Sequence, residues 1–178
     1  MQRRIFLLLV VAMIAMILMA VPAFAGAPVS SYSSSMGFTV SMTTVAETEY
    51  EIQLIGHSLD FNTAGVNQTV ASQTPLSILN SGARKFDVYV SADAPPSLSG
   101  AHVLSFSDSP GMDQVRWTLA QHPGSGLDSS VTDTAATFFG TIDPGDGMAL
   151  YSTVRLGTGL TYAGQYAWSA TVYAVPAM

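Results

Sequence analysis

The 178-residue sequence contains no cysteine, which excludes disulfide bonds, thiol nucleophiles and cysteine-ligated zinc. Charged residues are also few: they make up 10% of the chain, against about a quarter in an average soluble domain. The sequence has no glycine-rich phosphate loop, no dinucleotide-binding fingerprint and no Gly-x-Ser-x-Gly motif. We therefore expect no cofactor and no enzymatic activity.

Basic residues are the scarcer charged class, with six against 12 acidic residues. Two of the six, Arg3 and Arg4, precede an unbroken apolar run over residues 5–21. Pro22 ends the run, and the small-x-small sequence Ala23-Phe24-Ala25 follows. A basic start, an apolar middle and a small-residue cleavage site are the layout of a secretory signal peptide. The sequence therefore predicts a signal peptide over residues 1–25 and a secreted, extracellular or cell-surface protein.

Cleavage after Ala25 would leave a mature chain that starts at Gly26 and has about 153 residues, the size of one domain. That chain would hold four basic and 12 acidic residues, a net charge of −8, which disfavours nucleic acid as a partner. The alternative is a retained membrane anchor, since a 17-residue apolar run is at the short limit for a spanning helix. We favour cleavage, and we therefore expect the protein to contact a membrane only through the signal segment, before it is cleaved.

After the signal, residues 26–37 are serine-rich and unpatterned, which indicates a flexible mature N-terminus. From Phe38 onward the apolar residues recur with the two-residue period of β-strands, and no amphipathic helix of ten residues is found. Ten segments are candidate strands, of which seven to nine are expected to form: residues 38–42, 48–54, 59–61, 75–79, 85–91, 103–106, 115–119, 138–142, 148–156 and 165–175. Turn residues separate them, and Asn80-Ser81-Gly82 predicts a hairpin between the strands at 75–79 and 85–91.

This pattern predicts an all-β fold: a single antiparallel β-sandwich of jelly-roll or immunoglobulin-like type, with seven to nine strands over residues 38–178. Five residues on apolar strand faces are expected in its core: Phe86, Val88, Tyr166, Trp168 and Val172.

Two groups of segments carry a resemblance. The first joins Leu59-Asp60-Phe61, residues 75–82 and residues 85–90; the second joins residues 142–146, 150–156 and 164–174. In this order they resemble the TasA/camelysin-like surface and biofilm-fibre proteins. The resemblance implies a jelly-roll-like sandwich that assembles into filaments, with an N-terminal segment of one subunit completing the sheet of the next.

A second resemblance concerns wall binding. Trp117-Thr118-Leu119 is similar to the Trp-x-Leu signature of WxL cell-wall-binding domains, which carry another such motif near the C-terminus. Here the corresponding place reads Trp168-Ser169-Ala170, which breaks the pattern. We expect both tryptophans to pack in the core instead.

Few residues are candidates for chemistry. His57, His102 and His122 are far apart in sequence, and a zinc site would need them to converge in space, so solvated loop histidines are expected. Glu47, Glu49 and Glu51 share one strand face; they predict a solvated face, with a cation site or a glycosidase pair as alternatives.

Two turns could carry a ligand or a modification. Asp143 and Asp146 offer a Ca²⁺ ion two carboxylates where it takes six to eight oxygens, so a plain turn is expected. Asn67-Gln68-Thr69 is a glycosylation sequon, which indicates a surface loop.

The function expected from these observations is structural: a subunit of an extracellular filament or surface layer that assembles with copies of itself by β-strand addition. The pairing segment would be residues 26–37 with the strand that follows, in which Phe38, Val40 and Met42 would fill pockets of the neighbouring subunit. The alternative is a monomeric cell-surface module that binds glycan, cell-wall or matrix polymer. A hydrolase is a third, remote class.

Overall fold

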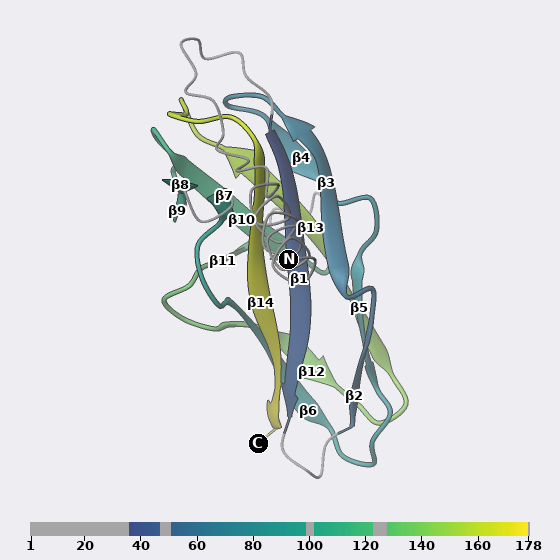
Figure 1. Cartoon of the computed structure of the whole chain (residues 1–178). Helices are drawn as coiled ribbons and strands as arrows, with labels where there is room; N and C mark the ends of the chain where they lie inside the picture. Colours follow the sequence, from purple (N-terminus) through teal and green to yellow (C-terminus); the bar gives the residue numbers. More distant parts are fainter. Residues whose placement is uncertain (1–35, 47–50, 99–101, 123–127, 178) are drawn as a thin grey trace, which may run out of the picture.

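A computed structural model describes residues 36–46, 51–98, 102–122 and 128–177 of the chain. Every named element in these ranges is a β-strand, and the strands form two curled sheets that pack together (Figure 1). The described residues include no helix with the length and hydropathy needed to cross a bilayer. The predicted signal peptide and residues 26–35 of the predicted mature N-terminus lie outside the described ranges.

The first sheet is called here the β14 sheet. Its strands, in spatial order, are β12 (Thr137–Ile142), β6 (Phe86–Ala92), β14 (Gln165–Pro176), β1 (Met36–Ala46) and β3 (Ser58–Ala64). Two short strands complete it: β7 (Ser97–Leu98) pairs with β14, and β8 (His102–Val103) pairs with β7.

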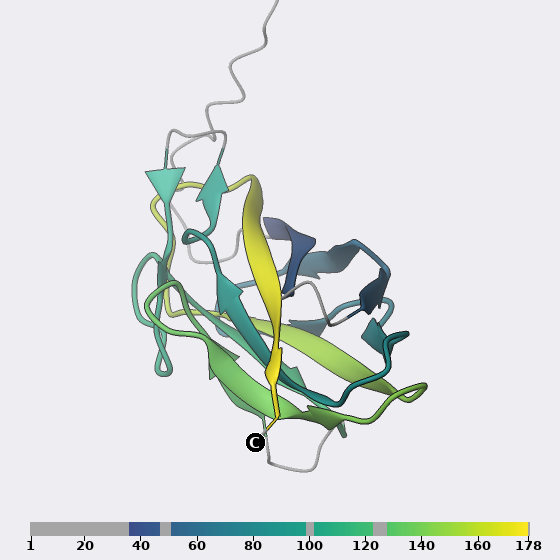
Figure 2. The same cartoon turned by 90° about the horizontal axis from the view of Figure 1, so that it is seen from below.

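The second sheet is called the β13 sheet. Its strands, in spatial order, are β11 (Ser129–Val131), β10 (Gln114–Ala120), β13 (Gly147–Leu156), β5 (Leu76–Asn80) and β2 (Ile52–Ile55). The short strands β4 (Thr69–Ala71) and β9 (Ser105–Phe106) pair with β13 and β10. Figure 2 shows the two sheets from below.

The predicted all-β sandwich is confirmed at the level of two packed sheets, but the prediction of purely antiparallel pairing is wrong. β1 runs parallel to β14 over ten residue pairs, and β9 runs parallel to β10. Side chains alternate in the same way in both kinds of pairing, so the two-residue period could not distinguish them. Parallel strands need a long connection, and the whole of the chain between β1 and β14 supplies one.

The predicted number of strands is also too low, because the described residues contain fourteen. Five of them, β4, β7, β8, β9 and β11, have only two or three residues. A stretch that short shows no alternation, so sequence periodicity does not reveal it.

The hairpin predicted between residues 75–79 and 85–91 does not form. β5 pairs with β2 and β13, whereas β6 lies in the other sheet, between β12 and β14. The connecting turn crosses from one sheet to the other and is held by the buried side chain of Asn80. Its Nδ2 donates to the carbonyl oxygens of Arg84 (2.8 Å) and Ile142 (3.1 Å), and its Oδ1 accepts from the Gly82 N–H (3.0 Å).

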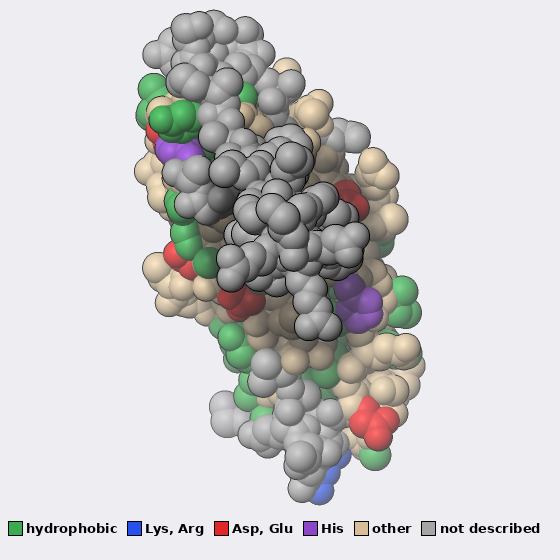
Figure 3. All heavy atoms as spheres, in the orientation of Figure 1, with side chains coloured by type: hydrophobic (Ala, Val, Ile, Leu, Met, Phe, Trp, Pro, Cys, Tyr) green, Lys and Arg blue, Asp and Glu red, His purple; other side chains and the backbone are tan. Residues whose placement is uncertain are grey.

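The core fills the space between the inner faces of the two sheets. All five side chains predicted to be buried are buried: Phe86, Val88, Tyr166, Trp168 and Val172. Trp117 is also buried, as expected. The outer surface carries little charge: on the face seen in Figure 3 the carboxylates are scattered singly among uncharged side chains.

Candidate functional site

The predicted pairing segment lies in β1, in the interior of the β14 sheet. Phe38, Val40 and Met42 point into the core of their own chain, with exposed fractions of 1%, 0% and 4%. The Phe38 ring lies 6.2 Å from the rings of both Tyr166 and Trp168, measured between centroids. The three side chains thus fill apolar pockets, and in this structure the pockets belong to the same subunit.

β1 is hydrogen-bonded on both of its edges. On one side Phe38, Val40 and Met42 are in register with Tyr166, Trp168 and Ala170 of β14. On the other side the pairing with β3 ends at Ser41 opposite Ser58, and the Met42 N–H donates to the His57 carbonyl oxygen at 2.8 Å. β1 therefore occupies a slot between β14 and β3, which no other described strand bridges (Figure 1).

Hydroxyl groups join β1 to β14 on the opposite face. The Thr43 and Thr171 hydroxyl oxygens are 3.3 Å apart, and the Thr171 hydroxyl donates to Asp93 Oδ1 at 2.7 Å. The slot is thus apolar on its inner side and polar on its outer side, as expected for a strand in a sheet with one face on the core.

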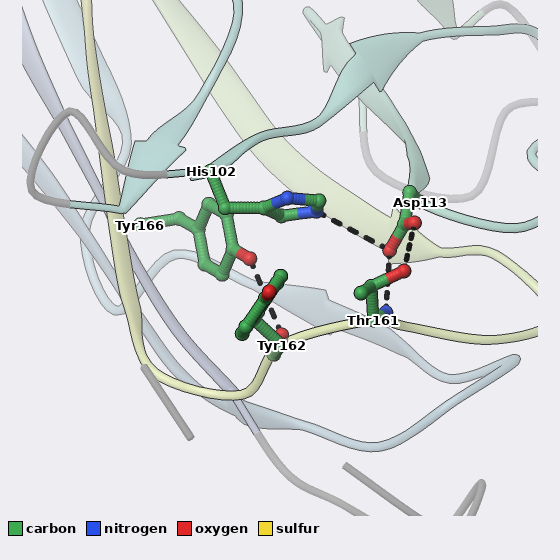
Figure 4. A network of polar contacts seen from close by, with 5 residues as sticks. All are labelled: His102, Asp113, Thr161, Tyr162 and Tyr166. Atoms are coloured by element: carbon green, nitrogen blue, oxygen red, sulfur yellow. Dashed lines mark hydrogen bonds and ion pairs between the residues drawn. The ribbon is translucent and has the colours of Figure 1, made fainter. Parts of the chain in front are cut away.

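A polar network that the sequence analysis missed lies at one end of the sandwich (Figure 4). His102 Nε2 is 3.4 Å from Asp113 Oδ1, within the range of an ion pair. Asp113 also accepts hydrogen bonds from the backbone N–H (2.6 Å) and the hydroxyl of Thr161. Nearby, the Tyr166 hydroxyl donates to the Tyr162 carbonyl oxygen at 3.2 Å. The network joins three separate segments of the chain, at His102, at Asp113 and at residues 161–166, so local sequence spacing does not reveal it.

The network shifts the pKa values of Asp113 and Tyr166. Partial burial raises the pKa of Asp113, but the two hydrogen bonds from Thr161 and the positive charge of His102 outweigh it and hold the pKa below its ordinary value of 3.8. Burial, together with the negative charge of Asp113, raises the pKa of Tyr166 to about 12.

The His–Asp pair of this network joins β8 to the residue that precedes β10. The Thr161 hydroxyl donates to the carboxylate rather than to the imidazole, so it is not aligned as a nucleophile activated by His102. Asp113 itself has a φ of +52°, a left-handed conformation that aspartate tolerates better than most residues. The network thus ties the start of β10 to the segment before β14.

The other histidines and the glutamate row form no cluster. His57 is exposed between β2 and β3, and His122 is exposed after the end of β10. His102 is half-buried in the network described above. Glu51 is exposed, and Glu47 and Glu49 lie outside the described residues. Within the described ranges, no three His, Cys, Asp or Glu side chains are grouped so that they could hold a metal ion.

The two turns that could carry a ligand or a modification are both on the surface. Asp143 and Asp146 are exposed in the turn between β12 and β13, where the Asp146 N–H donates to the Asp143 carbonyl oxygen at 3.0 Å. Asn67 is exposed, with a φ of +60°, in the turn that follows β3. The surface turn expected at the sequon is present, and glycosylation of Asn67 stays a prediction.

Comparison with known proteins adds no family, since no family model and no curated protein matches this chain. The class that the structure defines is therefore an all-β protein of two curled, mixed sheets packed together.

Proposed function

We propose that this protein is a secreted structural subunit of an extracellular filament or surface layer. Subunits would assemble when β1 of one chain enters the slot between β14 and β3 of another. The observation that carries the proposal is the position of β1, which lies between two strands of its sheet. No described strand precedes β1, so only its C-terminal end is joined to another described strand.

The slot cannot stay empty at low cost. Withdrawal of β1 would expose Phe38, Val40 and Met42, each of which gains about 1.5–3 kcal/mol from burial. It would also expose the slot face of β14, and it would leave the edges of β14 and β3 open to other strands. Some copy of β1 must therefore fill the slot.

A β1 strand from another subunit can make the same contacts as the subunit's own strand. Exchange of an identical element conserves the pairing and the buried area, so it is a low-cost route to assembly. Each subunit would donate one strand and accept one, and such a head-to-tail contact continues into an open chain unless its geometry closes a ring.

Two further observations support the proposal. The low charge of the chain suits a subunit that buries much of its surface against copies of itself. The resemblance to TasA/camelysin-like proteins also supports it, because in that family an N-terminal segment completes the sheet of the next subunit.

Cysteine pairs give a direct test, because the chain has no cysteine of its own. Ser41 and Ser169 are exposed and directly opposite in the β1–β14 register. In the mature S41C/S169C variant a disulfide forms within one chain if β1 pairs with the β14 strand of its own subunit. It forms between chains if β1 is exchanged. We expect a ladder of disulfide-linked oligomers on a non-reducing gel, which a reducing agent collapses.

The matched control is the T118C/T153C variant. In the parent protein the hydroxyl oxygens of Thr118 and Thr153 are 2.5 Å apart across β10 and β13. Neither strand is part of the exchange, so this pair should link within one chain only. Oxidised S41C/S169C protein that runs only as a monomer, under conditions where the parent protein assembles, contradicts strand exchange.

Deletion of residues 26–42 gives a second test. The deletion should abolish oligomers, and a synthetic peptide of residues 26–42 should bind the truncated protein in the part of the slot that the deletion vacates. Truncated protein that assembles as well as the intact chain would show that this segment does not pair between subunits. An intact protein that is monomeric at every concentration would remove the filament proposal and leave the monomeric binding module.

A further inference from the structure

A polar groove lies at the corner where the chain passes from β12 in one sheet to β13 in the other. Its volume is about 530 Å³, inside the range of roughly 300–1,000 Å³ that is usual for small-ligand sites. The polar and aromatic side chains that line it are Gln121, His122, Thr141, Asp143, Asp146 and Tyr151. None of these residues belongs to the β1 slot, so the groove is independent of the proposed assembly.

Gln121, which follows β10, is one of the residues that line the groove. Its side-chain amide donates to the Phe139 carbonyl oxygen and lies 3.8 Å from the Met148 sulfur. Gln121 thereby links the end of β10 in the β13 sheet to β12 in the β14 sheet. The β12 backbone makes room for it with a register shift between Phe138 and Gly140.

Gly140 is needed at this shift for two reasons. Its φ of +142° is one that L side chains rarely adopt, and a Cβ there would lie 2.9 Å from Gln121 Nε2. Such bulges are frequent next to functional sites, where they redirect side chains. The hydrogen bond to the Phe139 carbonyl oxygen holds the Gln121 amide in place.

The lining selects the charge of a ligand. Asp143 and Asp146 supply two carboxylates, and none of the described residues that line the groove is a lysine or an arginine. Phosphate, sulfate and uronic-acid groups would meet like charge there without a cationic partner. The carboxylates, the amide and the imidazole are instead suited to accept and donate hydrogen bonds with hydroxyl groups.

An aromatic ring stands at the rim. Tyr151 is 41% exposed, although β13 is an interior strand of its sheet. A large exposed ring beside polar groups can pack on the apolar face of a flat ligand while its neighbours bind the ligand's polar edge. Sugars combine those two surfaces, because a pyranose ring has an apolar C–H face and a rim of hydroxyl groups.

We propose that this groove binds a segment of a neutral polysaccharide, with Tyr151 packing on a sugar ring and Asp143, Asp146 and Gln121 binding its hydroxyl groups. The proposal goes beyond the structural role above, because it gives each subunit a ligand of its own. A surface protein with both properties would attach to matrix or wall polymer through a site repeated at every subunit.

The test is an array of neutral, anionic and cationic oligosaccharides, followed by calorimetric titration of the mature protein with the best neutral trisaccharide. Tyr151→Ala and Asp146→Asn should each weaken binding about tenfold, the equivalent of about 1.4 kcal/mol. The matched controls lie outside the groove: Phe138→Ala removes another exposed ring, and Asp133→Asn removes another exposed carboxylate. Both controls should bind as the parent does, and all variants should keep its melting temperature.

Three outcomes overturn the proposal. The first is an absence of binding to every neutral oligosaccharide at millimolar concentration. The second is neutral-sugar binding that Tyr151→Ala and Asp146→Asn leave unchanged. The third is a preference for cationic oligosaccharides that Asp146→Asn abolishes and Tyr151→Ala does not, which would make the groove a reader of charge.

Discussion

Trp117 and Trp168 meet across the core, one from each sheet, with ring centroids 5.4 Å apart and ring planes at 74°. The edge-to-face arrangement is a favourable geometry for aromatic pairs. Their indole nitrogens differ: Trp117 Nε1 donates to the buried Ser152 hydroxyl at 2.8 Å, while Trp168 Nε1 is buried without a hydrogen-bond partner among the described residues. The two rings therefore share one contact but have unequal polar requirements.

This difference predicts unequal costs for the same substitution. Trp117→Phe leaves the Ser152 hydroxyl without its donor, whereas Trp168→Phe removes an unsatisfied N–H. We expect Trp117→Phe to lower the free energy of unfolding by about 1–2 kcal/mol more than Trp168→Phe, measured by urea denaturation. Trp168→Ala should cost about 3–5 kcal/mol, and the exposed-site control Ile55→Ala about 0.5 kcal/mol or less. Equal costs for the two Phe variants would contradict this assignment of polar contacts.

Asn80 should be among the most sensitive polar positions. It is fully buried, and its amide satisfies two carbonyl oxygens and one N–H at the crossing between the sheets. Asn80→Ala should cost about 2–4 kcal/mol in the free energy of unfolding, because it leaves these groups unpaired. Asn80→Asp should be no milder, since a carboxylate cannot donate to the Arg84 and Ile142 carbonyls. Ser81→Ala, an exposed change in the same turn, is the control and should have little effect.

The lowered pKa of Asp113 predicts a loss of stability in acid. A carboxyl group whose pKa is lower in the folded than in the unfolded state contributes stability above the unfolded value, here 3.8. That contribution is lost as the pH falls through the folded pKa. Asp113→Asn should therefore lower the melting temperature at pH 6, and its difference from the parent should shrink between pH 4 and pH 2. Asp133→Asn, in an exposed turn, should leave the pH profile unchanged.

The raised pKa of Tyr166 predicts a loss of stability in alkali. Its pKa of about 12 in the folded state lies above the ordinary value of 10, so the unfolded chain releases a proton first as the pH rises. The contribution of Tyr166 to stability is therefore present below pH 10 and falls between pH 10 and 12. Tyr166→Phe should unfold less steeply with pH in that window, as followed by circular dichroism. A parallel alkaline limb in the parent and the variant would show that Tyr166 does not titrate late.

Gly157 and Gly111 predict a steric contrast. A Cβ at Gly157 would lie 1.9 Å from the Gly111 carbonyl oxygen, so two backbone segments would have to separate. A Cβ at Gly111 would meet only the Gln114 side chain, at 3.4 Å. Gly157→Ala should thus lower the free energy of unfolding by at least about 2 kcal/mol, and Gly111→Ala by much less. Similar losses from the two substitutions would contradict the close approach.

The longer strands and their buried faces could be predicted from the sequence, because a strand with one face on the core has an apolar residue at every second position. The alternation at Phe86, Val88, Tyr166 and Trp168 is an example. What alternation does not encode is the partner. Both strands flanking Asn80 have the pattern of a hairpin, yet a buried amide turns the chain between the sheets.

The candidate sites show the same limit. Phe38, Val40 and Met42 could be assigned to an apolar strand face, but not to a slot between β14 and β3, because strand order depends on pairings distant in sequence. The groove that contains Gln121, Thr141 and Tyr151 is likewise assembled from two strands, the residues that follow β10, and a turn. The sequence identified Asp143 and Asp146 in that turn as candidate ligands. It did not indicate that the Tyr151 ring and the Gln121 amide lie beside them.

The parallel pair of β1 and β14 also sets an order of events during folding. Thr43 and Thr171 are in contact although 128 residues separate them in the sequence. Contacts of such long range form slowly, and this one cannot form before β14 has been synthesised. Every nascent chain therefore passes through a period in which its β1 has been synthesised while its own β14 has not. During that period the nearest complete β14 belongs to a molecule that was released earlier.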